Sequence, residues 1–227
     1  PLDLSLYLVL DPDLCGGPLG MVETARIAAG HGATVVQLRA PDWKKRQWLE
    51  TAAEIKSVLA PFGVPLIIND HIDVALAVDA EGVHVGQDDM PVDIVRRLIG
   101  PQKWLGLSVS SPAELAQAPL AGVDYLGIGP VYPTGTKLDA APACGLDGLA
   151  SMVMAANLPV VAIGGIHLGN CQPLLQAGAH GVAVVSAICG QSDPADATRR
   201  LLGEIRRVIP DGAPKTRFPD FCMDCIG

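Results

Sequence analysis

Short runs of apolar and β-branched residues alternate with longer amphipathic segments along nearly the whole chain. Each short run has the length and composition of a buried strand, whereas each longer segment repeats its apolar positions at helical spacing. The short runs predict eight strands: Leu6–Leu10, Thr34–Leu38, Pro65–Ile68, Gly82–Val85, Trp104–Leu107, Asp124–Ile128, Val160–Ile163 and Gly181–Val185. The longer segments predict eight helices: Gly20–Ala29, Lys44–Leu59, Ile72–Val78, Val92–Ile99, Pro112–Ala118, Leu146–Ala155, Asn170–Ala177 and Pro194–Val208.

This alternation of strand and helix predicts an α/β fold in which eight repeats close into a single-domain (β/α)8 TIM barrel. Ala-Gly and Gly-Ala steps at 29–33, 121–122 and 177–179 suit left-handed helix caps and mark the same repeats. An open doubly wound sheet is the main alternative. Its first turn usually carries Gly-x-Gly-x-x-Gly, whereas residues 11–16 read Asp-Pro-Asp-Leu-Cys-Gly. We expect residues 1–209 to form the barrel and residues 210–227 to be a tail outside it, free to be flexible.

The composition narrows the class of protein. The 227 residues are 49% hydrophobic and 18% charged, which is typical of an ordered chain with a substantial core. A net charge of −8 without any cluster of lysines and arginines argues against a nucleic-acid partner, so an anionic substrate would need local cations or a metal. No apolar run approaches the roughly twenty residues of a membrane span, and Pro1–Leu4 lacks the basic start of a signal peptide. We therefore expect a cytoplasmic protein without a membrane partner.

The six cysteines agree with a reducing compartment, because four of them are scattered singly along the chain. Only Cys222 and Cys225 form a C-x-x-C pair. That pair has neither a second pair nor a nearby histidine, so we interpret it as incidental or redox-active rather than as a zinc site.

Polar residues stand where the predicted strands end, which is where TIM barrels carry their active sites. The strand-end set is Gln37 and Arg39, Asn69 and Asp70, Asp88 and Asp89, and Ser108. Asp70 and Asp89 can supply the oxygen ligands that Mg²⁺ prefers, with waters and phosphate oxygens completing an octahedron. Either aspartate alone is more simply a helix cap, but two carboxylates at adjacent strand ends favour a metal. Asp88 remains an alternative to Asp89.

Two further segments suit the binding of phosphate. The loop after the sixth strand, Pro133–Lys137, combines two hydroxyls with a lysine. The ends of strands seven and eight, at Gly164–Gly165 and Val185–Ser186, are where many barrels hold a phosphate through backbone N–H groups. Two phosphate positions fit a reaction that joins a diphosphate to a monophosphate.

The histidines near these strand ends are better explained by structure than by catalysis. His84 lies within an apolar run, which predicts a packed and hydrogen-bonded barrel residue rather than a base. His71 follows Asp70, where a site role and a helix-start role are equally open.

Taken together, the motifs resemble the thiamine phosphate synthase (thiamine-phosphate pyrophosphorylase) family. The resemblance runs in order from about Tyr7 to Ile209 and rests on Gln37-x-Arg39, Ile68-Asn69-Asp70, Gly82–Asp89, Gly106-Leu107-Ser108, Gly127–Pro130, Pro133–Lys137, Ala162–Ile166 and Gly181–Ser186. It implies a TIM-barrel transferase of thiamine biosynthesis that uses magnesium. Such an enzyme joins hydroxymethylpyrimidine diphosphate to thiazole phosphate, giving thiamine phosphate and pyrophosphate.

The resemblance also implies a role for each matching residue. The pyrimidine diphosphate would bind Gln37, Arg39, Asn69, Ser108 and Lys137, and the thiazole phosphate would bind Thr134, Thr136, Gly165, Val185 and Ser186. Asp70 and Asp89 would hold Mg²⁺, and the expected catalytic residues are Arg39, Lys137 and Ser108. The family usually has a lysine two residues after the arginine, whereas this chain has Pro41, which cannot supply that charge. Lys44 and Lys45 are candidates to replace it.

The expected mechanism needs charge stabilisation rather than proton transfer. Pyrophosphate leaves the pyrimidine methylene, and the thiazole nitrogen, which carries no proton, attacks the resulting cation. Two alternatives remain. A thiazole tautomerase-like isomerase would give His71 or His84 a task, and a non-catalytic barrel would only bind phosphometabolites. The oligomeric state stays open, with a homo-oligomer as one alternative.

Overall fold

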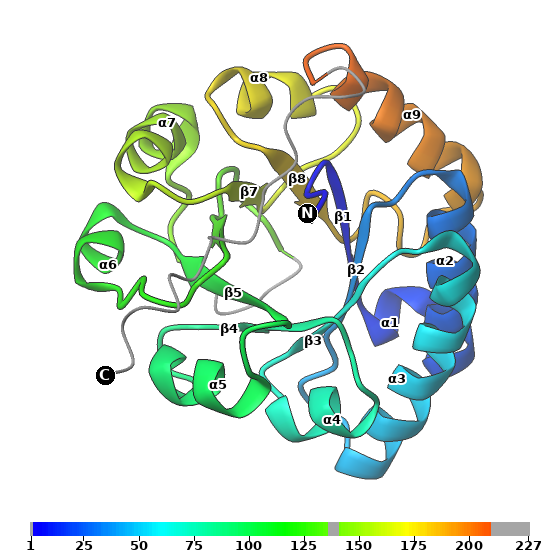
Figure 1. The fold of residues 1–227 in the computed structure, drawn as a ribbon. Helices are drawn as coiled ribbons and strands as arrows, with labels where there is room; N and C mark the ends of the chain where they lie inside the picture. Colours follow the sequence, from blue (N-terminus) through cyan, green and yellow to red (C-terminus); the bar gives the residue numbers. More distant parts are fainter. Residues whose placement is uncertain (1, 136–140, 210–227) are drawn as a thin grey trace.

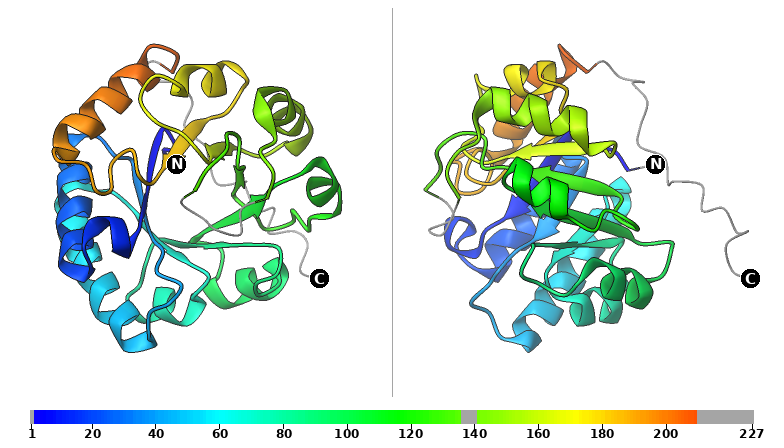
Figure 2. Two further views of the ribbon diagram at one scale, coloured as in Figure 1. Left: turned by 180° about the vertical axis from the view of Figure 1, so that it is seen from behind. Right: turned by 90° about the vertical axis from the view of Figure 1, so that its left-hand side faces the viewer.

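The structure, a computed structural model that describes residues 2–135 and 141–209, is a closed barrel of eight parallel strands surrounded by helices (Figures 1 and 2). The strands follow one another around the barrel in chain order: β1 (Leu6–Leu10), β2 (Val35–Leu38), β3 (Leu66–Asn69), β4 (Gly82–Val85), β5 (Trp104–Val109), β6 (Tyr125–Ile128), β7 (Val160–Ile163) and β8 (Gly181–Val184). The expected TIM barrel is thus confirmed. The expected tail, which includes Cys222 and Cys225, lies outside the described residues.

The helices of the repeats also lie where the periodicity predicts them. They are α2 (Pro18–His31), α3 (Lys45–Leu59), α4 (Ile72–Ala77), α5 (Val92–Ile99), α6 (Pro112–Gln117), α7 (Gly145–Ala156), α8 (Cys171–Gln176) and α9 (Pro194–Arg206). No expected boundary differs from the observed one by more than two residues. Two short elements were not expected: α1 (Pro12–Cys15) and the 3-10 helix η1 (Ala60–Phe62).

The missed helix α1 has clear local signals. The Asp11 side chain accepts a hydrogen bond from the Leu14 N–H at 2.9 Å, Pro12 occupies the first helical position, and Gly16 caps the end with φ 75°. These are the usual start and stop residues of a helix. Since α1 has only four residues, it gives no hydrophobic period by which it could be recognised.

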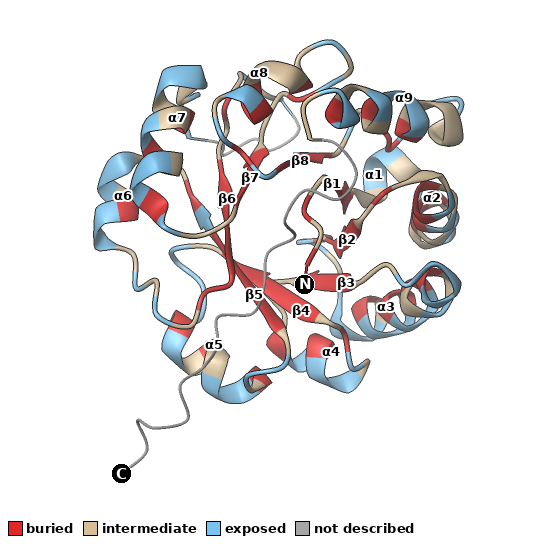
Figure 3. Ribbon diagram, turned by 45° about the horizontal axis from the view of Figure 1, so that its top comes forward, coloured by how far each residue is buried: buried red, intermediate tan, exposed pale blue. Residues whose placement is uncertain are grey.

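Strand residues alternate between two apolar layers. Leu8, Val36 and the other outward-facing residues pack against the helices, whereas Tyr7, Val35 and their equivalents fill the barrel interior. Both layers are buried, as the red strands of Figure 3 show. The same alternation puts four polar residues on the interior side of β2 to β5: Gln37, Asn69, His84 and Ser108. The polar strand-end residues therefore face a common space.

The opposite end of the barrel carries an arginine that connects the loop after α5 with the loop after α6. The Arg96 guanidinium donates hydrogen bonds to the backbone oxygens of Gly100, Lys103 and Gly122, and it pairs with the Asp124 carboxylate at 2.6 Å. The side chains of Arg96 and Asp124 are only 14% and 6% exposed. This end of a TIM barrel usually serves stability rather than catalysis.

Within residues 2–135 and 141–209, no helix is long and apolar enough to cross a membrane.

Candidate active site

The candidate active site lies at the carboxyl ends of the strands and has two parts. One part contains two acidic side chains from the ends of β3 and β4, and the other is a cleft at the ends of β6, β7 and β8.

Asp70 is the first acidic residue of the site and follows β3 directly. Its backbone has φ 60°, in the left-handed region that aspartate and asparagine tolerate better than most residues. The Asn69 side-chain amide donates to Asp70 Oδ2 at 2.7 Å, and the Asp70 N–H donates to the His84 oxygen at 2.9 Å. Both bonds hold the Asp70 carboxyl group at the mouth of the barrel.

Asp89 provides the second carboxylate. Its Oδ2 accepts a hydrogen bond from the Gly86 N–H at 2.7 Å, which turns the side chain back towards the end of β4. There the Asp89 carboxyl group lies close enough to that of Asp70 to raise its pKa. We call these two residues the carboxylate pair. The carboxylate that acts on Asp70 is thus that of Asp89, the residue that the family resemblance favours over Asp88.

The two carboxyl groups of the carboxylate pair repel each other when both are ionised. Burial and the neighbouring carboxyl group of Asp89 raise the pKa of Asp70 to about 7, and the Arg39 charge only partly opposes this. A cation between the two carboxylates would relieve their repulsion, and their hard oxygen ligands suit Mg²⁺. In the described part of the chain, no three His, Cys, Asp or Glu side chains come together to hold a metal alone. The donor set therefore fits an ion that completes its coordination with waters and substrate oxygens.

Gln37, Arg39 and Ser108 belong to the same side of the mouth. Gln37 is buried in the barrel interior, and Arg39 follows the end of β2, close enough for its charge to act on Asp70. The Ser108 hydroxyl lies 2.8 Å from His84 Nε2 at the exposed end of β5. His84 itself is buried with both ring nitrogens hydrogen-bonded, which confirms its prediction as a packed barrel residue.

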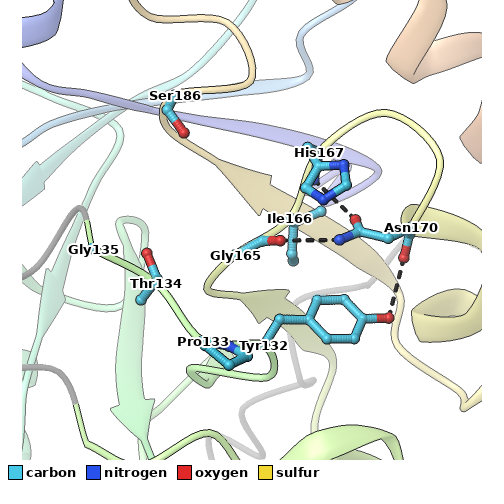
Figure 4. Close-up of a pocket in the computed structure, with 9 residues that line it drawn as sticks. All are labelled: Tyr132, Pro133, Thr134, Gly135, Gly165, Ile166, His167, Asn170 and Ser186. Carbon is cyan, nitrogen blue, oxygen red and sulfur yellow. Dashed lines mark hydrogen bonds between the residues drawn. The ribbon is translucent and has the colours of Figure 1, made fainter.

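The cleft is the second part of the site and has a volume of about 480 Å³ (Figure 4). Its walls are formed by Tyr132, Pro133, Thr134, Gly135, Gly165, Ile166, His167, Asn170 and Ser186. Three of the residues expected at the thiazole phosphate therefore line one cleft: Thr134, Gly165 and Ser186. Val185 precedes Ser186, is half-buried and is not part of the wall. Thr136 and Lys137 lie outside the described residues.

Asn170 is a wall residue that the sequence gave no reason to select as part of the site. Its side-chain amide donates to the Gly165 oxygen at 3.0 Å, and its Oδ1 accepts the His167 N–H at 2.9 Å. The Tyr132 hydroxyl donates to the Asn170 backbone oxygen at 3.3 Å, as the dashed lines of Figure 4 show. Asn170 thus connects the loops after β6 and β7. An asparagine at the start of a predicted helix is normally read as a cap, but the Asn170 side chain makes no cap hydrogen bond and bonds to the loop instead.

Gly165 allows those two loops to lie against each other. Its φ is 66°, and a Cβ at this position would lie 2.6 Å from the Pro133 oxygen and 2.8 Å from Tyr132 Cβ. Only glycine combines this backbone conformation with so close an approach. The wall of the cleft therefore depends on glycine at position 165.

A lysine contacts the residue that follows Asp70. Lys45 Nζ is 2.6 Å from His71 Nδ1 and 2.8 Å from the Asp73 carboxylate, and His71 directly follows Asp70. The His71 ring stacks edge-on against Trp48 with a centroid distance of 4.5 Å. His71 is thus held at the start of α4, and of the two lysines considered in place of Pro41, Lys45 is the one that contacts the residue next to Asp70.

Comparisons with known proteins agree on one family. The family model for thiamine monophosphate synthase matches residues 6–188. Thiamine-phosphate synthase from Laribacter hongkongensis is 54% identical over 200 residues, covering 88% of this chain and 94% of the relative. The corresponding enzyme from Xanthobacter autotrophicus is 52% identical over 201 residues, covering 88% and 95%.

Solved structures give the same result. Thiamine phosphate pyrophosphorylase from Pyrococcus furiosus superimposes with a TM-score of 0.83 at 37% identity, covering 92% of this chain and 98% of that one. A 3-hexulose-6-phosphate synthase, at 18% identity and a TM-score of 0.66, shares the fold alone.

Proposed function

The chain belongs to the thiamine monophosphate synthase family and is a transferase. We propose that the residues at the mouth of its barrel join hydroxymethylpyrimidine diphosphate to thiazole phosphate in the following way. The observation that carries the proposal is the placement of the carboxylate pair and the cleft at the same end of one barrel. Such an arrangement lets a diphosphate and a monophosphate approach each other with their reacting atoms between the two parts.

The pyrimidine diphosphate binds on the side of β2 to β5. The Arg39 guanidinium is suited to bind phosphoryl oxygens, and Asn69, Gln37 and Ser108 provide polar contacts to the substrate. By family resemblance, Lys137 completes this set from the loop after β6. Lys45 adds a positive charge near the diphosphate, which suits a chain with proline at position 41.

The thiazole phosphate occupies the cleft. The Thr134 and Ser186 hydroxyls and the backbone at Gly165 supply donors to its phosphate, and by resemblance Thr136 and Val185 contribute further contacts. A phosphate held there leaves the thiazole ring free to point towards the barrel axis, where the pyrimidine methylene would lie.

Asp70 and Asp89 would hold the Mg²⁺ ion. When bound, this ion supplies positive charge that neutralises the departing pyrophosphate. Arg39 and Lys137 stabilise the same negative charge, and Ser108 donates a hydrogen bond to it. The thiazole nitrogen attacks the pyrimidine cation without losing a proton, so no side chain has to act as a general base. Hydroxymethylpyrimidine diphosphate and thiazole phosphate thus become thiamine phosphate and pyrophosphate.

His71 and His84, the two histidines considered for an isomerase from the sequence, do not favour that alternative. Both ring nitrogens of His84 are engaged inside the barrel, and His71 is bonded to Lys45. Neither residue is part of the cleft wall. A thiazole tautomerase would also leave the carboxylate pair without a task.

The proposal is tested by mixing the protein with both substrates and Mg²⁺ and measuring pyrophosphate and thiamine phosphate. We expect equal amounts of the two products, and their loss when the metal is chelated. Asp89→Ala should lower turnover about 100-fold or more, whereas Asp88→Ala, the matched control, should not. Binding of thiazole phosphate without release of pyrophosphate would contradict the reaction, and equal effects of the two substitutions would contradict the metal site.

A further inference from the structure

Five polar side chains form one continuous hydrogen-bonded chain through the barrel interior. Gln37 Nε2 donates to the Tyr7 hydroxyl at 2.8 Å, and the Tyr7 and Tyr125 hydroxyls are 2.8 Å apart. The Tyr125 hydroxyl lies 3.1 Å from His84 Nδ1, and His84 Nε2 lies 2.8 Å from the Ser108 hydroxyl. The chain crosses from β2 through β1, β6 and β4 to β5. Ser108, its last member, is exposed at the mouth of the barrel, whereas Gln37 at the other end of the chain is buried.

The barrel interior is shaped around this chain. A Cβ at Gly106 would lie 2.3 Å from His84 Nδ1 and 2.3 Å from Tyr125 Cζ, and one at Gly127 would lie 3.1 Å from His84 Cε1. Neither glycine has a φ that demands glycine. Gly106 is therefore required for space, and at Gly127 a side chain would press against the His84 ring. The rings of His84 and Tyr125 consequently approach to a centroid distance of 5.5 Å. An interior packed only with apolar side chains would not require two glycines next to one histidine ring.

The chemistry of the members gives the chain a direction. The Gln37 amide nitrogen can only donate, so the Tyr7 oxygen accepts from it. The Tyr7 hydroxyl uses its own O–H to donate to the Tyr125 oxygen, in the direction that leaves no O–H in the chain without an acceptor. The Tyr125 hydroxyl then donates to His84 Nδ1, which places the single ring proton of a neutral histidine on Nε2. That proton is donated to the Ser108 oxygen. The Ser108 hydroxyl therefore keeps its own proton for an acceptor outside the chain.

We propose that Tyr7, Tyr125 and His84 are positioning residues that keep the Ser108 hydroxyl a hydrogen-bond donor towards the diphosphate substrate. The inference rests on the proposed contact between Ser108 and that substrate. Without the chain, His84 could adopt its other tautomer and accept a hydrogen bond from Ser108, which would remove the donor from the site. The His84 ring is buried with both nitrogens hydrogen-bonded to hydroxyl groups, in keeping with a neutral ring.

The direction of the chain can be measured without any turnover. Nitrogen-15 spectra of histidine-labelled protein distinguish the two neutral tautomers, and His84→Gln identifies the His84 signals among the five histidines. We expect the Nε2-protonated form in the wild-type protein without substrates. We also expect Tyr125→Phe, which removes only the hydroxyl, to shift the population towards the Nδ1-protonated form. A wild-type ring protonated on Nδ1 would overturn the proposal.

The consequence for the substrate is measured by a double-mutant cycle. Ser108→Ala should raise KM for the pyrimidine diphosphate or lower kcat, so that kcat/KM falls about tenfold or more, and Tyr125→Phe should have a similar effect. The double variant should be no worse than Ser108→Ala, because Tyr125 acts only through Ser108. KM for thiazole phosphate should change little in all three variants.

The outcomes separate this inference from the function on which it rests. Independent, multiplicative effects of Tyr125→Phe and Ser108→Ala would show that Tyr125 acts through packing. That result would overturn the proposed role of the hydrogen-bonded chain and leave the contact of Ser108 with the diphosphate intact. Normal kinetics of Ser108→Ala would overturn both the contact of Ser108 with the diphosphate and the purpose of the chain. An equal rise in KM for both substrates in Tyr125→Phe would also contradict it, because it would indicate general damage to the barrel.

Discussion

At the scale of single residues, the position proposed for Asp70 at the metal site carries a cost in stability. Its pKa is raised to about 7 from an ordinary value near 3.8, first by burial and then by Asp89. The folded protein therefore holds this proton more tightly than the unfolded chain does. The free energy of unfolding that Asp70 contributes falls as the pH rises from about 4 to about 7. Above pH 7, two negative charges face each other unless a cation lies between them.

Asp70→Asn should therefore stabilise the metal-free protein and inactivate it. Asparagine tolerates the φ of 60°, and at pH 8 it removes one of the two facing charges. Because Asp70 is only half-buried, solvent screening limits the gain to about 1 kcal/mol, or about 2–4 °C in Tm. Turnover with Mg²⁺ should fall about 100-fold or more. Thermal unfolding with a chelator at pH 8 and pH 5 checks this, since the gain should disappear at pH 5.

Asp88→Asn is the matched control for Asp70→Asn. It changes the same functional group next to the carboxylate pair, so both Tm and turnover should stay close to those of the wild type. A lower Tm of Asp70→Asn at pH 8 would show that Asp70 stabilises the mouth of the barrel, and the argument from charge repulsion would be wrong.

At the scale of elements, the site depends on loops that touch each other rather than on any single strand. The loop after β6 lies against the loop after β7 at Gly165, and Asn170 connects the two. Gly165→Ala should push the Tyr132–Pro133 segment out of place, because its new Cβ would lie 2.6 Å from the Pro133 oxygen. We expect KM for thiazole phosphate to rise about tenfold or more and KM for the pyrimidine diphosphate to change less. Steady-state kinetics with each substrate varied in turn provides the measurement.

Gly169→Ala separates the steric effect from backbone strain. Gly169 also has a positive φ, 97°, but no atom lies within 4 Å of the position of its Cβ. Both substitutions should therefore cost a similar amount of backbone strain, about 1 kcal/mol or somewhat more. Only Gly165→Ala should change KM for thiazole phosphate. A similar rise in KM for both variants would attribute the effect to strain in the loop after β7.

At the scale of the whole molecule, the barrel and its strand-end residues could be predicted because both follow from a regular repeat. Alternation along β2 and β3 directs Gln37 and Asn69 inward, so both could be assigned to the candidate site from the sequence. Contacts across the barrel have no such period. Tyr7 and Tyr125 are separated by 118 residues and meet only after closure, and the Asp70–Asp89 contact depends on how the Gly86 N–H turns one side chain. The loop contacts of Asn170 could not be predicted either, because an asparagine at the start of a helix looks like an ordinary cap.

The two ends of the barrel are expected to have separate roles, one in catalysis and one in stability. A substitution at Arg96 tests this separation. Arg96→Met leaves the buried Asp124 carboxylate without its partner and three backbone oxygens without a donor. Breaking such a pair costs about 3–5 kcal/mol, so Tm should fall by about 10 °C. Arg97→Met, at the exposed neighbouring position, should leave Tm nearly unchanged. Because Arg96 lies at the end opposite the carboxylate pair, kcat and KM of both variants should match those of the wild type at temperatures well below unfolding. A changed KM in Arg96→Met with an unchanged Tm would show that the two ends of the barrel are coupled.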